Sequence, residues 1–288
     1  MKNGRIIKLI GGKYTVLGEQ GDVITLTPRG KMRHINTSPK VGDLVTYNDD
    51  FIQEVLPRHN DLVRPAIANV DQALLIHSAT RPTFSFNLLD RFLTIIENED
   101  ITPIIVVTKI DLLRDHDLIN LKEQLAYYEE FYDIYYVDAK HREHIEQLDT
   151  IFTDKISVLA GQTGAGKSTL LNAIDPTLNL KTDDISDALG RGKHTTRHVE
   201  LIPLSGGLIA DTPGFSKLDF RNIDLDNVPL NFVDFFALSH QCKFNGCTHI
   251  NEPKCAVKQA LNDGDILPSR YENYKRIYEE VKDIKPKY

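Results

Sequence analysis

The spacing of hydrophobic and polar residues divides the chain into three stretches, and the first is residues 1–62. Apolar and polar positions alternate there over short runs, separated by turn residues at 11–12, 18, 21–22, 28 and 42–43. This pattern is typical of short strands joined by tight turns. We therefore predict a compact all-β barrel. Five short strands suggest an oligonucleotide-binding (OB) fold, although an SH3-like barrel would give a similar strand count.

In the second stretch, residues 63–218, short apolar runs alternate with longer helical segments. The candidate strands are residues 73–76, 104–107, 134–137, 156–159, 199–202 and 208–210. Such alternation predicts an α/β domain with a parallel sheet covered by helices. In the third stretch, residues 219–288, the strand signal disappears and amphipathic helical segments surround a group of cysteines. We expect three domains with these limits.

The strongest chemical motif is the segment 161–169, which matches G-x-x-x-x-G-K-[ST] between an apolar strand and a helix. Its glycines allow backbone N–H groups to surround a polyphosphate. Lys167 is expected to reach the β- and γ-phosphates, and the Ser168 hydroxyl to coordinate Mg²⁺. The predicted nucleotide-binding residues of this phosphate loop are Gly161, Gln162, Thr163, Gly164, Ala165, Gly166, Lys167, Ser168 and Thr169.

Two further segments have the spacing of nucleotide-dependent switches. Asp211 and Gly214 lie in D-T-P-G, after the last candidate strand. This carboxylate can hold Mg²⁺ through water, and the Gly214 N–H can contact a γ-phosphate. Between the phosphate loop and Asp211, either Thr195 or Thr196 can cap the metal ion, and the sequence does not choose between them.

The segment Thr108, Lys109, Ile110 and Asp111 resembles the N-K-x-D element with which GTPases bind guanine. A carboxylate at Asp111 accepts from two N–H donors of guanine, whereas adenine offers a ring acceptor there and would leave buried polar groups unpaired. Thr108 replaces the usual asparagine. Residues 138–140 resemble the S-A-K element, whose backbone supports the base.

These motifs are circularly permuted, because the base-binding elements at 108 and 138 precede the phosphate loop at 161. A parallel sheet tolerates such a rearrangement when a surface loop is cut and the former termini are joined. As a result, the chain that leaves Asp211 passes directly into the C-terminal segment. Switch movement should therefore be coupled to that segment.

All three cysteines lie within 14 residues of one another, as Cys242, Cys247 and Cys255, together with His249. Three thiolates and one imidazole fit a structural, tetrahedral Zn²⁺ with no open position for catalysis. A disulfide would use two of the cysteines and is disfavoured in a reducing compartment. The nearby His240 is a competing ligand, but we expect it at the surface.

Composition adds limits on location and partners. The 288 residues carry a net charge of −7, which argues against nonspecific coating of nucleic acid. Residues 1–40, however, hold eight basic and two acidic side chains, a local charge of +6. No apolar run approaches the ~18 residues of a membrane span, and residues 1–12 do not form a signal peptide. We expect a cytoplasmic monomer that does not bind membranes.

The permuted motif order, the N-terminal barrel and the Cys/Cys/His/Cys group together resemble the RsgA (YjeQ/YloQ) family of small ribosomal subunit-dependent GTPases. The resemblance spans essentially the whole chain. It implies an OB-fold barrel, a permuted GTPase domain and a zinc domain. It also implies binding to GTP, GDP, the 30S subunit and its 16S rRNA, and GTP hydrolysis stimulated by the subunit during late maturation.

Phe215 occupies the position where many GTPases carry a water-orienting glutamine, and it cannot hydrogen-bond to water. Intrinsic hydrolysis should therefore be slow. His194, close to the switch threonines, is our candidate for the missing catalytic group. Two other functions are compatible with the motifs: a nucleotide-gated binding factor whose hydrolysis is incidental, and a P-loop ATPase or kinase without a role on RNA.

Overall fold

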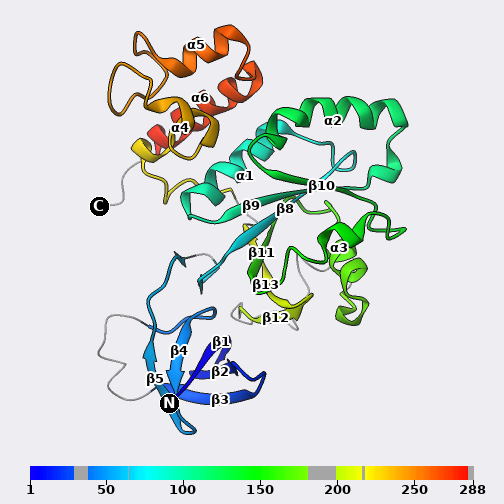
Figure 1. Cartoon of the computed structure of the whole chain (residues 1–288), viewed down its shortest axis with the longest axis vertical. Coiled ribbons are helices and arrows are strands. Elements are labelled where there is room, and N and C mark those ends of the chain that lie inside the picture. The colour runs from blue at the N-terminus through cyan, green and yellow to red at the C-terminus, as the bar shows by residue number, and fades with distance from the viewer. Residues whose placement is uncertain (29–37, 64, 181–198, 216–217, 285–288) are drawn as a thin grey trace.

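The computed structural model describes residues 1–28, 38–63, 65–180, 199–215 and 218–284. Three bodies follow one another along the long axis of the molecule, with the N-terminal strands at one end and the C-terminal helices at the other (Figure 1). The central body is a sheet with helices on both faces. This arrangement follows the order of the chain.

The N-terminal body is a closed five-stranded barrel. Its strands are β1 (Lys2–Ile10), β2 (Lys13–Gly18), β3 (Val23–Pro28), β4 (Leu44–Tyr47) and β5 (Phe51–Val55), in the order β1-β2-β3-β5-β4. β1 pairs with β4 to close the barrel, and β3 and β5 are parallel. Alternate residues such as Ile6, Val16 and Val45 are fully buried inside it. The predicted OB-type barrel is confirmed.

A short hairpin of β6 (Asp61–Leu62) and β7 (Ile67–Ala68) links the barrel to the sheet. The N–H of Ala68 donates to the carbonyl of Val41, and the Asn69 amide donates to the carbonyl of Gly42. Gly42 has a φ of +92°, and a Cβ there would lie 2.0 Å from the carbonyl oxygen of Ala68. Only glycine allows this close approach.

The central sheet has the strand order β10-β9-β8-β11-β13-β12. Its members are β8 (Gln72–Ser78), β9 (Thr102–Thr108), β10 (Asp133–Val137), β11 (Ile156–Ala160), β12 (Leu201–Leu204) and β13 (Gly207–Phe215). The sheet is parallel as predicted, except at β12, which runs antiparallel to β13. Ser205 and Gly206 join these two strands with φ values of 44° and 78°, the backbone signs of a tight hairpin turn.

Strand β13 is longer than the sequence suggests. The sequence predicts it at residues 208–210, with Asp211 beyond its end, but the strand continues to Phe215. The physical reason is the neighbouring strand: Leu159 and Ala160 of β11 pair with Pro213 and Phe215, across two register shifts.

Helices cover the two faces of the sheet. α1 (Phe86–Asn98) and α2 (Asp115–Glu129) share one core with Ala73 and Leu75 of β8. α3 (Lys167–Ile174) shares the other core with Leu74 and Ile76. This alternation is the period of two that a strand buried on both faces requires. Short 3-10 helices occupy Ile110–Leu112, Ile145–Leu148, Pro176–Leu178 and Leu225–Asn227.

The C-terminal body consists of α4 (Val233–Ser239), α5 (Ala256–Asp263) and α6 (Pro268–Asp283). α6 packs on α1 (Figure 1) and carries Arg270, whose side chain is 1% exposed. Arg270 forms ion pairs with Asp90 on α1 at 2.5 Å and with Asp234 on α4 at 2.8 Å. Within the described parts of the chain, no helix is both long enough and apolar enough to cross a bilayer.

Candidate functional site

The phosphate loop leaves the carboxyl end of β11 and enters α3, as the motif predicts. Gly161 has a φ of +124°, and a Cβ there would lie 2.1 Å from the carbonyl oxygen of Ile76 on β8. Gly164 and Gly166 also have positive φ values, of 78° and 98°. A side chain at Gly161 would collide with the sheet, so the loop needs glycine to fold closely over the strand ends.

Lys167 lies at the first position of α3, with its ammonium turned back over the loop. Its Nζ donates to the carbonyls of Gly161 at 2.8 Å and Gln162 at 2.7 Å. Burial lowers the pKa of Lys167 to about 8, because a desolvated ammonium is disfavoured. A polyanion at the N-terminus of α3 would offset that cost. The next residue, Ser168, is 4% exposed.

The predicted base-binding segment, residues 108–111, is hydrogen-bonded directly to the phosphate loop. The Thr108 hydroxyl donates to the carbonyl of Ala165 at 2.5 Å. The ammonium of Lys109 donates to the carbonyl of Gly164 at 2.6 Å. The bonded residues are 57 and 55 positions apart in the chain, yet these hydrogen bonds hold the two segments side by side. The threonine that replaces the usual asparagine thus ties the two loops together through its hydroxyl.

Asp111 lies in the 3-10 helix that follows, with its side chain exposed. One carboxylate oxygen of Asp111, one of Asp138 and one ring nitrogen of His141 all lie within 4.8 Å of one another. Asp138 follows β10 and is 2% exposed. The sequence placed Asp138 in the S-A-K-like element but did not identify His141. The only sequence signal for it was the D-x-x-H spacing, which is common in turns.

The switch residues are described only in part. Asp211 and Gly214 belong to β13, whose backbone runs beside the phosphate-loop strand β11. Thr195, Thr196 and His194 lie outside the described residues. Their predicted roles therefore remain predictions.

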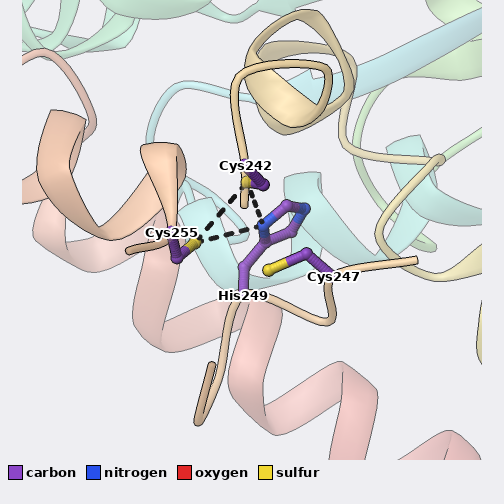
Figure 2. A group of neighbouring side chains, drawn as sticks. All are labelled: Cys242, Cys247, His249 and Cys255. Carbon is purple, nitrogen blue, oxygen red and sulfur yellow. Dashed lines mark hydrogen bonds between the residues drawn. The ribbon is translucent and has the colours of Figure 1, made fainter. Parts of the chain in front are cut away.

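A second candidate site lies between α4 and α5, where Cys242, Cys247, His249 and Cys255 converge (Figure 2). Nδ1 of His249 is 3.3 Å from Sγ of Cys255 and 3.7 Å from Sγ of Cys242, and the two sulfur atoms are 3.9 Å apart. A tetrahedral ion with bonds of ~2.3 Å to sulfur and ~2.0 Å to nitrogen separates its ligand atoms by roughly 3.5 to 3.8 Å. The three measured spacings are close to this range, and the donor atom of Cys247 lies within 4.8 Å of the other three, so the group is a candidate site for one metal ion.

The surroundings of this candidate metal site suit thiolate ligands. Backbone N–H groups of Ala256 and Lys258 point at Sγ of Cys242 and of Cys255, at 3.3 and 3.5 Å. Burial and the neighbouring thiols raise the pKa of Cys247, so three thiolates at this place require a compensating cation. The Tyr271 hydroxyl donates to the carbonyl of His249 at 2.6 Å and fastens the site to α6. The competing ligand His240 is not part of the group.

Comparisons with known proteins agree on one family. A family model described as RsgA GTPase matches residues 55–221, and one described as RsgA N-terminal domain matches residues 3–54. The "Small ribosomal subunit biogenesis GTPase RsgA" of Bacillus subtilis is 48% identical, and that of Geobacillus thermodenitrificans 47% identical, each over 100% of both chains.

Solved structures give the same result for the fold. The structure of "YloQ, a circularly permuted GTPase" is 43% identical and has a TM-score of 0.86, with 100% of this chain and 97% of that chain covered. The structure of YjeQ from Thermotoga maritima is 35% identical and has a TM-score of 0.88, with 99% of each chain covered. The permuted order of motifs predicted from the sequence is therefore the order of a known fold.

Proposed function

The chain belongs to the RsgA GTPase family, and from that premise we propose that it binds GTP and GDP and hydrolyses GTP while it assists maturation of the small ribosomal subunit. The observation that carries the proposal is the direct contact of the two loops, in which Thr108 bonds to Ala165 and Lys109 to Gly164. One nucleotide can therefore reach both loops, with its phosphates in the phosphate loop and its base beside Asp111. Three domains, with limits near residues 62 and 218, belong to the same proposal.

In this proposal the residues of the phosphate loop hold the polyphosphate, and Asp111 selects the base. Backbone N–H groups of residues 161–169 and the ammonium of Lys167 contact phosphate oxygens, which replace the carbonyls of Gly161 and Gln162 as its partners. Ser168 and Asp211 would hold Mg²⁺, which neutralises charge on the phosphates when it is bound. Asp111 accepts from guanine, and adenine would leave it unpaired.

Hydrolysis by the isolated chain should be slow. Phe215 offers no hydrogen bond to an attacking water, so a further group must orient that water. His194 remains our candidate within the chain, and contact with the ribosomal subunit would bring it, or a group of the subunit, into place. If His194→Ala kept full subunit-stimulated turnover, the assignment to His194 would be abandoned.

The metal at Cys242, Cys247, His249 and Cys255 is proposed to be a structural Zn²⁺. Three sulfur donors and one nitrogen donor match its preference, and four protein ligands leave no position for a reacting water. The metal would organise the long connection between α4 and α5. It has no part in the hydrolysis.

The partner is proposed to be the 30S subunit with its 16S rRNA, which the chain would meet in the cytoplasm as a monomer. The local charge of +6 in residues 1–40 fits phosphate contacts. Subunit binding should accordingly weaken as salt rises, because each phosphate contact releases counterions. A binding constant independent of salt would argue against RNA contact.

Nucleotide titration tests the proposal most directly. Labelled GDP should bind more tightly than labelled ADP. Asp111→Asn should lose at least about 100-fold in GDP affinity, because its amide keeps one acceptor oxygen but turns an N–H group toward an N–H group of guanine. The same variant should gain affinity for xanthosine diphosphate, whose 2-oxo group can accept from the new amide. Asp115→Asn, in the first turn of α2, is the control. Tighter binding of ADP by the unmodified chain would favour an ATPase or kinase instead.

A second measurement addresses the partner. A non-hydrolysable GTP analogue should retain 30S particles on the immobilised protein, and GDP should release them. Single-turnover hydrolysis with and without 30S particles separates a stimulated GTPase from a binding factor whose hydrolysis is incidental. Equal rates in the two conditions would favour the binding factor.

A further inference from the structure

The turn that follows β10 encloses a buried carboxylate. Oδ1 of Asp138 accepts from the backbone N–H groups of Lys140 and His141 at 2.9 and 3.0 Å, and the backbone of Asp138 pairs with that of Glu143. Although burial would raise the pKa of Asp138, these bonds and the His141 ring outweigh it and hold the pKa below its usual value. Asp138 is therefore a buried anion.

This anion faces the residue that selects the base. The carboxylates of Asp111 and Asp138 approach within 4.8 Å. Like charges at that separation repel strongly where water is excluded, and a bound base would exclude water from Asp111. Among the described residues, none donates a hydrogen bond to Asp111 that could offset this repulsion.

His141 lies close to both carboxylates. Its Nδ1 bonds to Oδ2 of Asp138 at 2.5 Å, and one ring nitrogen lies within 4.8 Å of both carboxylates. The imidazole side chain is 54% exposed, so it is not needed to fill a core. Its ring is instead hydrogen-bonded to Asp138, the carboxylate that repels Asp111.

We propose that His141 is a positioning residue for guanine recognition, which engages the Asp138 carboxylate so that Asp111 can accept hydrogen bonds from the base. Asp138 shapes the turn, and its hydrogen bonds require an acceptor at this position. This acceptor places a negative charge beside Asp111. The hydrogen bond from His141 to Asp138 weakens the repulsion between the two carboxylates. The inference deepens the proposed function and rests on it.

The test is a double-mutant cycle on GDP affinity. His141→Ala leaves the two carboxylates facing each other without compensation, and it should weaken GDP binding about tenfold. Asp138→Asn keeps an acceptor for the N–H groups of the turn but removes the charge. In the double variant Asp138→Asn/His141→Ala, GDP affinity should therefore return to within about threefold of the unmodified chain.

Inosine diphosphate gives a second readout, because it lacks the 2-amino group that Asp111 contacts. The preference for GDP over inosine diphosphate should fall in His141→Ala and recover in the double variant. His116→Ala is the matched control. That histidine pairs with Asp117 at 3.0 Å on α2 and is 61% exposed, and its loss should change neither value by more than about twofold.

The outcomes separate the two levels of the proposal. If the unmodified chain prefers ADP to GDP, the proposed function fails. If it prefers GDP, but His141→Ala binds GDP like the unmodified chain, the positioning role is wrong. The same conclusion follows if the double variant binds GDP no better than His141→Ala, because a side chain that merely supports the turn would not be rescued by removal of a charge.

Discussion

The two ends of the molecule are attached to the central sheet in different ways. At the barrel end, the described contact of β1 with the strand-edge residue Glu200 is a single β-bridge and an ion pair from Lys8 at 2.7 Å, with side chains 34% and 33% exposed. At the helical end, Arg270 is buried between two aspartates. The first contact competes with water, and the second does not.

The buried contact is also the more elaborate one. The Tyr128 hydroxyl on α2 and the Asn273 amide on α6 donate to Asp90, and the Tyr127 hydroxyl donates to Asp234. Buried charges with all these partners are expensive to separate, because every group would lose its hydrogen bond. The C-terminal helices should thus move together with α1. Barrel strand β1, by contrast, meets the edge of the sheet through an exposed ion pair, although the β6–β7 hairpin also holds the barrel through buried hydrogen bonds.

Of the changes considered, metal removal should destabilise the C-terminal body the most. A strong chelator should extract one Zn²⁺ per chain and unfold the connection between α4 and α5, because comparable sites contribute ~10 kcal/mol or more to folding. Limited proteolysis within residues 240–255 would show that the connection has opened, and metal analysis would give the stoichiometry. Cys247→Ser should behave in the same way, whereas His240→Ala should keep the metal. Loss of metal from His240→Ala would show that the ligand set is wrong.

Removal of the buried cation should have the next largest effect. Arg270→Met preserves most of the side-chain volume but leaves Asp90 and Asp234 without a counter-charge, and it should lower the free energy of unfolding by ~3 to 5 kcal/mol. Arg91→Met is the matched control, since Arg91 joins the same two helices through Glu280 with its side chain 20% exposed. We expect it to cost ~1 kcal/mol or less in urea unfolding. Equal losses in the two variants would contradict the contrast between buried and exposed attachments.

Glu97 on α1 should make the stability of the folded chain depend on pH. Burial raises the pKa of Glu97 on α1 from 4.5 to about 7, so the folded chain holds this proton more tightly than the unfolded chain. The contribution of Glu97 to stability is therefore complete below about pH 4.5 and is lost as the pH rises through about 7. Glu97→Gln should reduce the fall in Tm between pH 5.5 and 8. An unchanged pH profile would mean that Glu97 ionises freely in the folded chain.

The barrel contact should give the smallest effect. Lys8→Glu should cost only ~0.2 to 1 kcal/mol, the usual range for an exposed ion pair. The charge swap Lys8→Glu/Glu200→Lys should recover that amount in urea unfolding. A loss as large as that of Arg270→Met would show that the barrel is attached as firmly as the C-terminal helices.

Much of the candidate site could be predicted because its chemistry is local in the chain. The phosphate loop needs glycines, a lysine and a serine at fixed spacing, and the metal site has its four ligands within 14 residues. The permuted order could also be read directly, since it depends only on which motif comes first. For the same reason the strands that precede the motifs were found close to their observed positions.

The direction of strand β12 could not be predicted from the local sequence pattern. The sequence predicts its existence, but its antiparallel direction depends on the Ser205–Gly206 turn returning the chain at once onto β13. The extension of β13 to Phe215 likewise depends on its neighbour β11, because hydrogen-bonding partners across a sheet decide where a strand ends.

By itself the sequence determined which groups are candidates to bind phosphate, base and metal, because each candidate set lies within a short segment and its spacing can be read directly. Only the tertiary structure decided which charges meet. Asp90, Asp234 and Arg270 lie on three helices, and Asp111 meets Asp138 and His141 across two strand ends. Electrostatic energy depends on distance in space and on burial, and neither can be read from positions along the chain.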